Sequence, residues 1–197
     1  KPANALTFND GGRKIADLGR ATTPLMGATH DRLQCVGDTR FAPPEQLYAL
    51  PAPIPLFERF KFQQAGDLWN LGSLAYYLLT GTNVTQEIVG RLRPELRPPN
   101  ESGGWKDQVS LITPYWKSII ADMIQEARIT LVEVEGVDIE SELDSILSMI
   151  TELCEPDYTA RGMPNFVGKE NQYNLARYIA RLDLCRSRLL VRSKIAK

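Results

Sequence analysis

Residues 67–81 read Asp-Leu-Trp-Asn-Leu-Gly-Ser-Leu-Ala-Tyr-Tyr-Leu-Leu-Thr-Gly, and this stretch carries the strongest helix signal in the chain. Asp67 is well placed near a helix N-terminus, where a short polar side chain accepts a hydrogen bond from an unpaired backbone amide. Gly81 supplies the stop, because glycine adopts the left-handed conformation that ends many helices. Apolar residues between them occupy nearly every face, which is typical of a helix buried on all sides. We therefore predict a central buried helix over 66–81.

Upstream of this helix, the sequence predicts a short β-hairpin followed by a long loop. Strands are expected at 5–8 and 13–16, on either side of the turn signal Asn9-Asp10-Gly11-Gly12. Residues 20–42 have no sustained periodicity and hold several Thr, Gly and Pro residues. A segment of this length and composition is typical of a functional loop rather than a linker.

Downstream, the spacing of apolar residues predicts further helices, so the fold class is mainly α with a short β-hairpin at the start. A short helix begins at Pro43-Pro44-Glu45-Gln46, because proline is tolerated in a first turn. Longer helices are expected at 115–127, at 143–153 and in the final segment 170–197. Residues 51–55 and 94–105 are expected loops, and 129–134 fits either a strand or a helix.

Composition limits the function classes. A chain of 197 residues that is 43% hydrophobic is long enough for one well-formed core. A net charge of −1 gives no general attraction to nucleic acid or membrane, so no nucleic-acid partner is favoured. The three cysteines are odd in number and lack metal-ligand spacing, which favours a reducing, cytoplasmic location. No apolar run in these residues approaches membrane-spanning length, so no membrane segment is expected.

Two charged segments leave alternatives open. Six acidic residues lie between Glu133 and Asp144 with no basic residue among them, which fits a solvated face or a docking surface for a basic partner. The final helix sets an apolar stripe against Arg and Lys residues, which fits nucleic acid or an anionic surface. It also fits arginine stems that cover apolar surface. The acidic run is a further candidate partner for this basic helix.

Two short segments near the start point to metal chemistry. Lys1-Pro2-Ala3-Asn4 precedes the predicted hairpin, and Ile15-Ala16-Asp17-Leu18-Gly19 ends it. An Asn and an Asp on adjacent strands can converge on one divalent cation, and magnesium prefers such hard oxygen ligands together with phosphate oxygens. Lys1 would then meet the phosphate that the metal holds. This combination favours phosphoryl transfer.

The order of these motifs resembles the C-terminal lobe of eukaryotic-like Ser/Thr protein kinases. In that family a Lys-Pro-X-Asn run leads through a hairpin to Asp-Phe-Gly, and Leu18 stands here in place of the Phe. Gly37-Asp38-Thr39-Arg40-Phe41-Ala42-Pro43-Pro44-Glu45 is similar to the end of the activation segment. Residues 67–72 are similar to the Asp-X-Trp-X-X-Gly pattern of the family's central helix. Glu155-Pro156-Asp157-Tyr158-Thr159-Ala160-Arg161 is similar to the late segment that supplies an arginine.

The resemblance implies a protein kinase-like C-terminal lobe over 1–197, built around that central buried helix. Its parts would be the catalytic and metal-binding loops (1–19), the activation segment (20–45), the central helix (66–81) and a divergent, insertion-like region (94–144). The Gly-rich loop, the strand Lys, the Glu and the catalytic Asp would lie upstream of Lys1. We therefore expect an N-terminal lobe as a partner, with this part alone inactive.

The resemblance also implies roles for individual residues. Asp17 would bind the magnesium ion that bridges the ATP phosphates, Asn4 would hold a second metal position, and Lys1 would neutralise charge on the transferred γ-phosphate. Glu45 and Arg161 would form a buried ion pair, and Asp67 would anchor the catalytic loop. The candidate activation-loop phosphorylation sites are Thr22, Thr23, Thr29 and Thr39.

The expected function is ATP- and magnesium-dependent transfer of phosphate to a hydroxyl of a protein substrate. Asp38 departs from the family, which often has Gly-Thr where this chain has Gly37-Asp38, and that departure leaves the substrate class open. A pseudokinase or scaffold lobe that binds a protein without phosphoryl transfer is the main alternative. A small-molecule kinase of related fold is disfavoured by Pro43-Pro44-Glu45 and by the Asp67-X-Trp signature, since those elements shape a platform for protein substrates.

Overall fold

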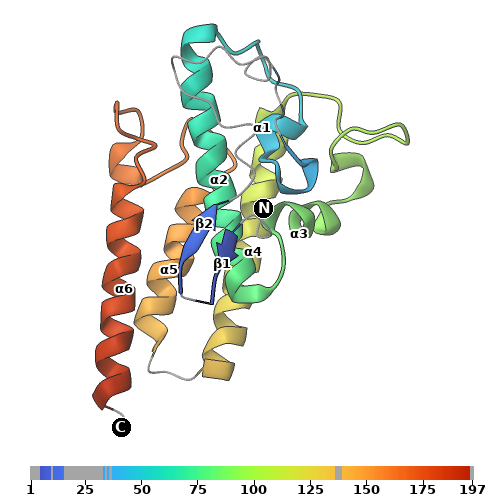
Figure 1. The fold of residues 1–197 in the computed structure, drawn as a ribbon. Helices are drawn as coiled ribbons and strands as arrows, with labels where there is room; N and C mark the ends of the chain where they lie inside the picture. The colour runs from blue at the N-terminus through green and yellow to red at the C-terminus, as the bar shows by residue number, and fades with distance from the viewer. Residues whose placement is uncertain are drawn as a thin grey trace.

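A computed structural model describes residues 5–9, 11–15, 33, 35, 37–135 and 139–195 of the chain. Within these residues the fold is mainly α, as predicted, with one short hairpin at the start (Figure 1). The hairpin pairs β1 (Ala5–Thr7) with β2 (Arg13–Ile15) in antiparallel register, with Ala5 opposite Ile15. Six helices follow: α1 (Pro44–Leu47), α2 (Arg59–Thr80), α3 (Val84–Arg91), α4 (Val109–Glu135), α5 (Glu140–Leu153) and α6 (Ala176–Ile195).

The central helix α2 is longer than predicted. It begins at Arg59 rather than near Asp67, because Phe62 and Ala65 continue the buried face of Trp69 and Gly72 for two more turns. Asp67 therefore lies in the third turn and caps nothing. The predicted stop is confirmed, since Gly81 has a left-handed φ of 77° and its amide donates to the Tyr77 carbonyl at 2.8 Å.

The prediction that α2 is buried on all sides was wrong for the last turns of the helix. Leu78 is 74% exposed, and Tyr77 also faces solvent. The helix is buried along one broad face from Phe62 to Tyr76, and its remaining apolar side chains are half-buried or exposed. An apolar sequence alone does not distinguish these two faces.

The main core forms where α2, α3, α4 and α5 meet. Its largest side chains are Trp69 of α2, Trp116 of α4 and Tyr48, which follows α1, and all three are essentially inaccessible. The Trp69 and Trp116 ring centroids lie 5.7 Å apart, and the Tyr48 ring meets Trp116 edge-on at 6.0 Å. Aromatic pairs of this geometry stabilise beyond the area that they bury.

Residues 94–144, expected to be insertion-like, are packed into this core. Helix α4 runs without interruption from Val109 to Glu135, so 129–134 is helical rather than a strand. Its buried face contributes Ile112, Trp116 and Met123 to the cluster that holds Trp69. Among the described residues of this region, only 97–108 lack a helix.

Helix α5 joins α2 to α6. A smaller cluster of Leu68, Met149, Leu153 and Tyr178 links the three helices. Helix α6 stands at the edge of the bundle beside α5 (Figure 1). Among the helices that the structure describes, none is long and apolar enough to cross a membrane.

The two charged segments are partly paired. Arg128 of α4 binds the acidic run through Glu140 and Asp144, the latter at 2.7 Å. Arg192 of α6 donates to the buried Glu142 at 2.6 Å. The acidic run therefore supplies partners for α4 and α6, and Arg192 joins it to the basic final helix.

Candidate functional site

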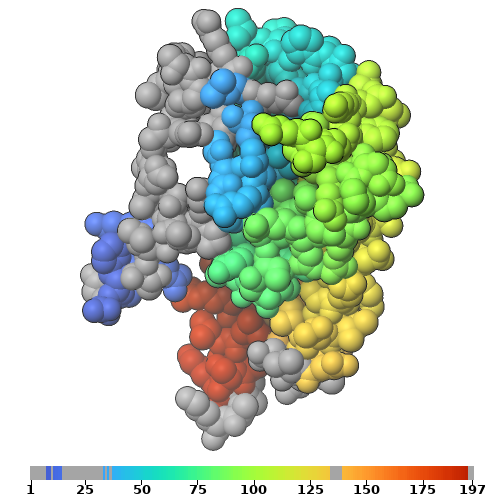
Figure 2. Space-filling view, turned by 90° about the vertical axis from the view of Figure 1, so that its right-hand side faces the viewer, coloured from blue at the N-terminus to red at the C-terminus, as the bar shows by residue number. Residues whose placement is uncertain are grey.

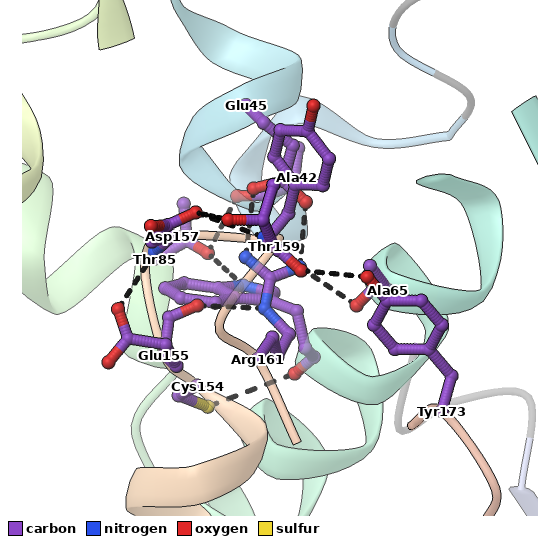
Figure 3. A network of polar contacts seen from close by, with 12 residues as sticks. Ala42, Glu45, Ala65, Thr85, Cys154, Glu155, Asp157, Thr159, Arg161 and Tyr173 are labelled. Atoms are coloured by element: carbon purple, nitrogen blue, oxygen red, sulfur yellow. Dashed lines mark hydrogen bonds and ion pairs between the residues drawn. The ribbon is translucent and has the colours of Figure 1, made fainter. Parts of the chain in front are cut away.

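The most completely built polar site surrounds Arg161, in the segment between α5 and α6. The Arg161 side chain is fully buried, and it lies against α1, α2 and its own loop. Figure 3 shows the guanidinium with Glu45 above it and the Ala65 backbone beside it. Three segments far apart in sequence therefore meet on one cation.

Glu45 and Arg161 form the expected buried ion pair. Arg161 Nη1 donates to Glu45 Oε1 at 2.6 Å, and Nη2 donates to Oε2 at 2.9 Å. The pair is bidentate, and both side chains have no solvent exposure. Charge-assisted bonds in this geometry are strong and directional, so they fix the orientation of α1 against the helical core.

Two further guanidinium hydrogens donate to backbone carbonyls. Arg161 Nη1 also donates to the carbonyl of Ala65 in α2, and Nε donates to the carbonyl of Glu155, both at 2.8 Å. The guanidinium lies over the Trp69 ring, 5.2 Å from its centroid, in a cation–π arrangement. This set of partners compensates for much of the cost of removing the arginine from water.

A second chain of bonds ties the segment before α1 to α2. Trp69 Nε1 donates to Thr85 Oγ1 at 3.1 Å, and Thr85 Oγ1 donates to the Ala42 carbonyl at 3.0 Å. Thr85 lies in the first turn of α3, where Asn83 caps the helix by accepting from the Gln86 amide. The residues 42–45 are therefore held from two sides, by Arg161 and by Thr85.

The loop that carries Arg161 is braced by residues just before α6. Gln172 Nε2 donates to the carbonyls of Thr159 and Arg161, at 2.8 and 2.9 Å. The Tyr173 hydroxyl donates to the Tyr158 carbonyl at 3.1 Å. These bonds satisfy buried carbonyls that no regular element pairs, and they hold the arginine in position.

Asp38 caps the short 3-10 helix η3 (Thr39–Phe41) ahead of α1, and Arg40 lies within it. Asp38 accepts from the Arg40 backbone amide at 3.1 Å and from Arg40 Nη2 at 2.6 Å. This carboxylate raises the pKa of the Arg40 guanidinium above its usual value, so the arginine stays charged. Thr39 lies beside the pair and is exposed.

Figure 2 shows this segment lying against α3. Residues of both elements line a hollow of about 660 Å³, which also reaches the loop after η5 (Pro94–Leu96). The polar residues Thr39, Arg40, Gln86 and Arg97 are part of its lining. The hollow is open and mixed in polarity, which suits an extended polypeptide better than a small apolar ligand.

Asp67 sits on the opposite side of α2 from the main core. It is exposed as a residue, but neighbouring protein atoms partly desolvate its carboxyl and raise its pKa above the usual value. Asp67 lines a hollow of about 460 Å³ together with Gln64, Tyr173 and Asn174. Within the described part of the chain it has no hydrogen-bond or ion-pair partner.

The expected catalytic and metal-binding residues Lys1, Asn4 and Asp17 lie outside the described residues. The same holds for Thr22, Thr23 and Thr29, whereas Thr39 is described and exposed. Elsewhere in the described ranges, no group of three or more His, Cys, Asp or Glu side chains could hold a metal ion. The magnesium site at Asn4 and Asp17 stays a prediction.

Sequence reasoning missed the residues that support the ion pair. Thr85, Gln172 and Tyr173 carry no motif, and their role depends on contacts made across the fold. Asn83 could have been recognised, because an Asn before an apolar run is a common helix cap. That cap would have placed Thr85 in the first turn of a helix, facing α2.

Comparisons with known proteins identify no relative. No protein-family model matches the chain, no curated protein matches it, and no solved structure matches it.

Proposed function

We propose that the chain is the C-terminal lobe of a Ser/Thr-type protein kinase that uses ATP and magnesium. In the intact protein it would transfer the γ-phosphate to a hydroxyl of a protein substrate, together with an N-terminal lobe, in the cytoplasm. The observation that carries the proposal is the bidentate Glu45–Arg161 pair at 2.6 and 2.9 Å. The kinase resemblance predicts this contact, whereas the helical spacing of apolar residues does not predict it.

The surroundings of the pair support the same proposal. The tryptophan of the Asp-X-Trp pattern lies under the arginine and binds, through Thr85, the residue that begins Ala42-Pro43-Pro44-Glu45. The three motifs that the structure describes therefore meet at one place. Such a junction would hold the end of an activation segment rigidly on the helical lobe.

The chemistry assigned to this lobe is positioning and electrostatic stabilisation. Magnesium would supply charge neutralisation at the ATP phosphates, held by Asp17 and Asn4. Lys1 would neutralise negative charge that develops on the transferred phosphoryl group, which in a loose transition state is the main task left to the protein. We assign the protein substrate to the hollow beside Thr39, which Arg40 and Arg97 also line.

The test is phosphate transfer from labelled ATP by the intact protein, with Asp17→Ala as the variant. Loss of a preorganised electrostatic contact typically costs about a hundredfold or more in turnover, and we expect at least that loss here. Asp10→Ala, which changes the carboxylate of the hairpin turn, is the matched control and should retain activity. Transfer that survives Asp17→Ala would refute the mechanism.

A pseudokinase or scaffold is the second candidate, and Asp38 favours it. Its carboxylate occupies the position of the family's substrate-loop threonine and is held by Arg40. The two functions differ in nucleotide binding by the full-length protein. A thermal shift with ATP that requires magnesium would favour the kinase, and no shift at millimolar ATP would favour the scaffold.

A further inference from the structure

Helix α6 presents an apolar stripe that the described fold leaves partly exposed. The outer stripe consists of four apolar residues and two polar ones on the same line: Leu175 just before α6, Ile179, Leu182, Arg186, Leu189 and Ser193. Ile179 is 56% exposed, and Leu175 and Leu182 are 39% and 38% exposed. Helix α5 packs against a different face of α6, through Tyr178 and Cys185, as the position of α6 at the edge of the bundle allows (Figure 1).

The spacing of the outer stripe is that of a coiled-coil seam. Its members follow one another at intervals of four, three, four, three and four residues. This alternation keeps apolar positions on one line along a helix and lets a second helix pack knobs into holes. A groove of about 560 Å³ runs along the stripe between Leu182 and Ser193, and Ile146 of α5 forms its other wall.

Two charged residues in or beside the outer stripe determine which partner helix could pack against it. Arg186 interrupts the apolar series in the middle, and Asp183 lies one turn earlier at its edge. Both side chains face the groove, and neither has an ion-pair or hydrogen-bond partner among the described residues. A partner must therefore offer an acid opposite Arg186 and a base opposite Asp183.

A second copy of α6 in antiparallel orientation meets both requirements at once. In that orientation Ile179 of one copy lies level with Leu189 of the other, and Leu182 lies level with Arg186. Arg186 then approaches Asp183 of the second copy, and the two-fold axis repeats the contact, as isologous interfaces require. Parallel pairing would instead place the two Arg186 side chains against each other.

We propose that this chain self-associates through α6, forming an antiparallel helix pair in which Arg186 and Asp183 bind reciprocally across the two-fold axis. The proposal is independent of phosphoryl transfer. One helix face is a small interface, so the dimer should be weak, with a dissociation constant of about 1–100 μM.

The test is analytical ultracentrifugation of the 197-residue chain over about 1–200 μM, a range that brackets the expected constant. Ile179→Asp should abolish the dimer, whereas Ala180→Asp, on the exposed side away from the stripe, should leave it intact. Arg186→Asp and Asp183→Arg should each weaken association by about tenfold or more. Far-UV circular dichroism establishes that each variant is folded.

The double variant Asp183→Arg/Arg186→Asp decides the orientation. It exchanges the two charges, so association should return to within about threefold of the original constant. A double variant as weak as either single one would overturn the proposal, and so would a wild-type chain that stays monomeric throughout. A monomer that instead cosediments with phosphatidylserine–phosphatidylcholine vesicles would assign the stripe to a lipid surface and would equally overturn it.

Discussion

Replacing Arg161 by Met should remove most of the stability of the fold. The substitution keeps much of the apolar length of the side chain but leaves the Glu45 carboxylate buried without its partner. Breaking one side of a buried ion pair typically costs about 3–5 kcal/mol. The carbonyls of Ala65 and Glu155 also lose a donor, at about 1–3 kcal/mol for a buried group left unsatisfied.

These costs overlap, because the freed groups relax together, and we expect a total of about 4–6 kcal/mol. A domain of ordinary stability has only about 5–15 kcal/mol, so Arg161→Met should be partly unfolded at 37 °C. Urea unfolding followed by tryptophan fluorescence is the measurement, since Trp69 lies directly under the guanidinium. Arg128→Met is the matched control: its carboxylate partners Asp144 and Glu140 are exposed and half-buried, so it should cost less than about 1 kcal/mol.

The double variant Glu45→Met/Arg161→Met tests the physical reason. It removes both charges, and replacing a whole buried ion pair by apolar side chains is often close to neutral. The double variant should therefore be more stable than Arg161→Met alone. A single variant that loses less than about 1 kcal/mol, or a double variant whose losses simply add, would refute the account of a tightly coupled pair.

Two further predictions concern the packing of α2 against α5. A Cβ at Gly72 would lie 2.6 Å from Cys154 Sγ and 2.7 Å from Leu153 Cβ, so Gly72→Ala should cost about 1–3 kcal/mol in urea unfolding. The control is Gly66→Ala, which should be tolerated because the nearest neighbour of a Cβ at Gly66 is the amide tip of Gln46, at 2.9 Å. Equal losses of stability in the two variants would contradict the packing of α2 against α5. Burial raises the pKa of the Cys154 thiol from 9.0 to about 12. Between these values the folded state retains a proton that the unfolded state loses, so the free energy of unfolding should fall as pH rises from about 9 to 12. Iodoacetamide at pH 8 should label Cys154 only in denaturant, and rapid labelling in the native protein would refute its burial.

The sequence predicted what local patterns determine. The hairpin, the stop of α2 at Gly81 and the existence of α4, α5 and α6 follow from turn residues and apolar spacing. It failed on the start of α2, because Asp67 has the chemistry of a cap and the burial of Phe62 and Ala65 is decided by tertiary packing. The strand-or-helix ambiguity at 129–134 has the same origin, since Leu131 and Val132 pack against the main core and tertiary contacts of this kind override local propensity.

In the candidate site, too, local sequence patterns did not predict the contacts between residues far apart in the chain. Glu45 and Arg161 are separated by 116 residues, and no composition, charge count or helical period could have paired them. Only the order of four short motifs predicted that contact, whereas Thr85 and Gln172 belong to no motif and were missed. Evidence for a fold is stronger when it lies in a long-range contact than in helix content, because many unrelated chains are mainly α. The ion pair therefore supports the kinase-like interpretation more than the secondary structure does. The next test of that interpretation is Asp17→Ala, because phosphate transfer that survives this substitution would refute the proposed mechanism.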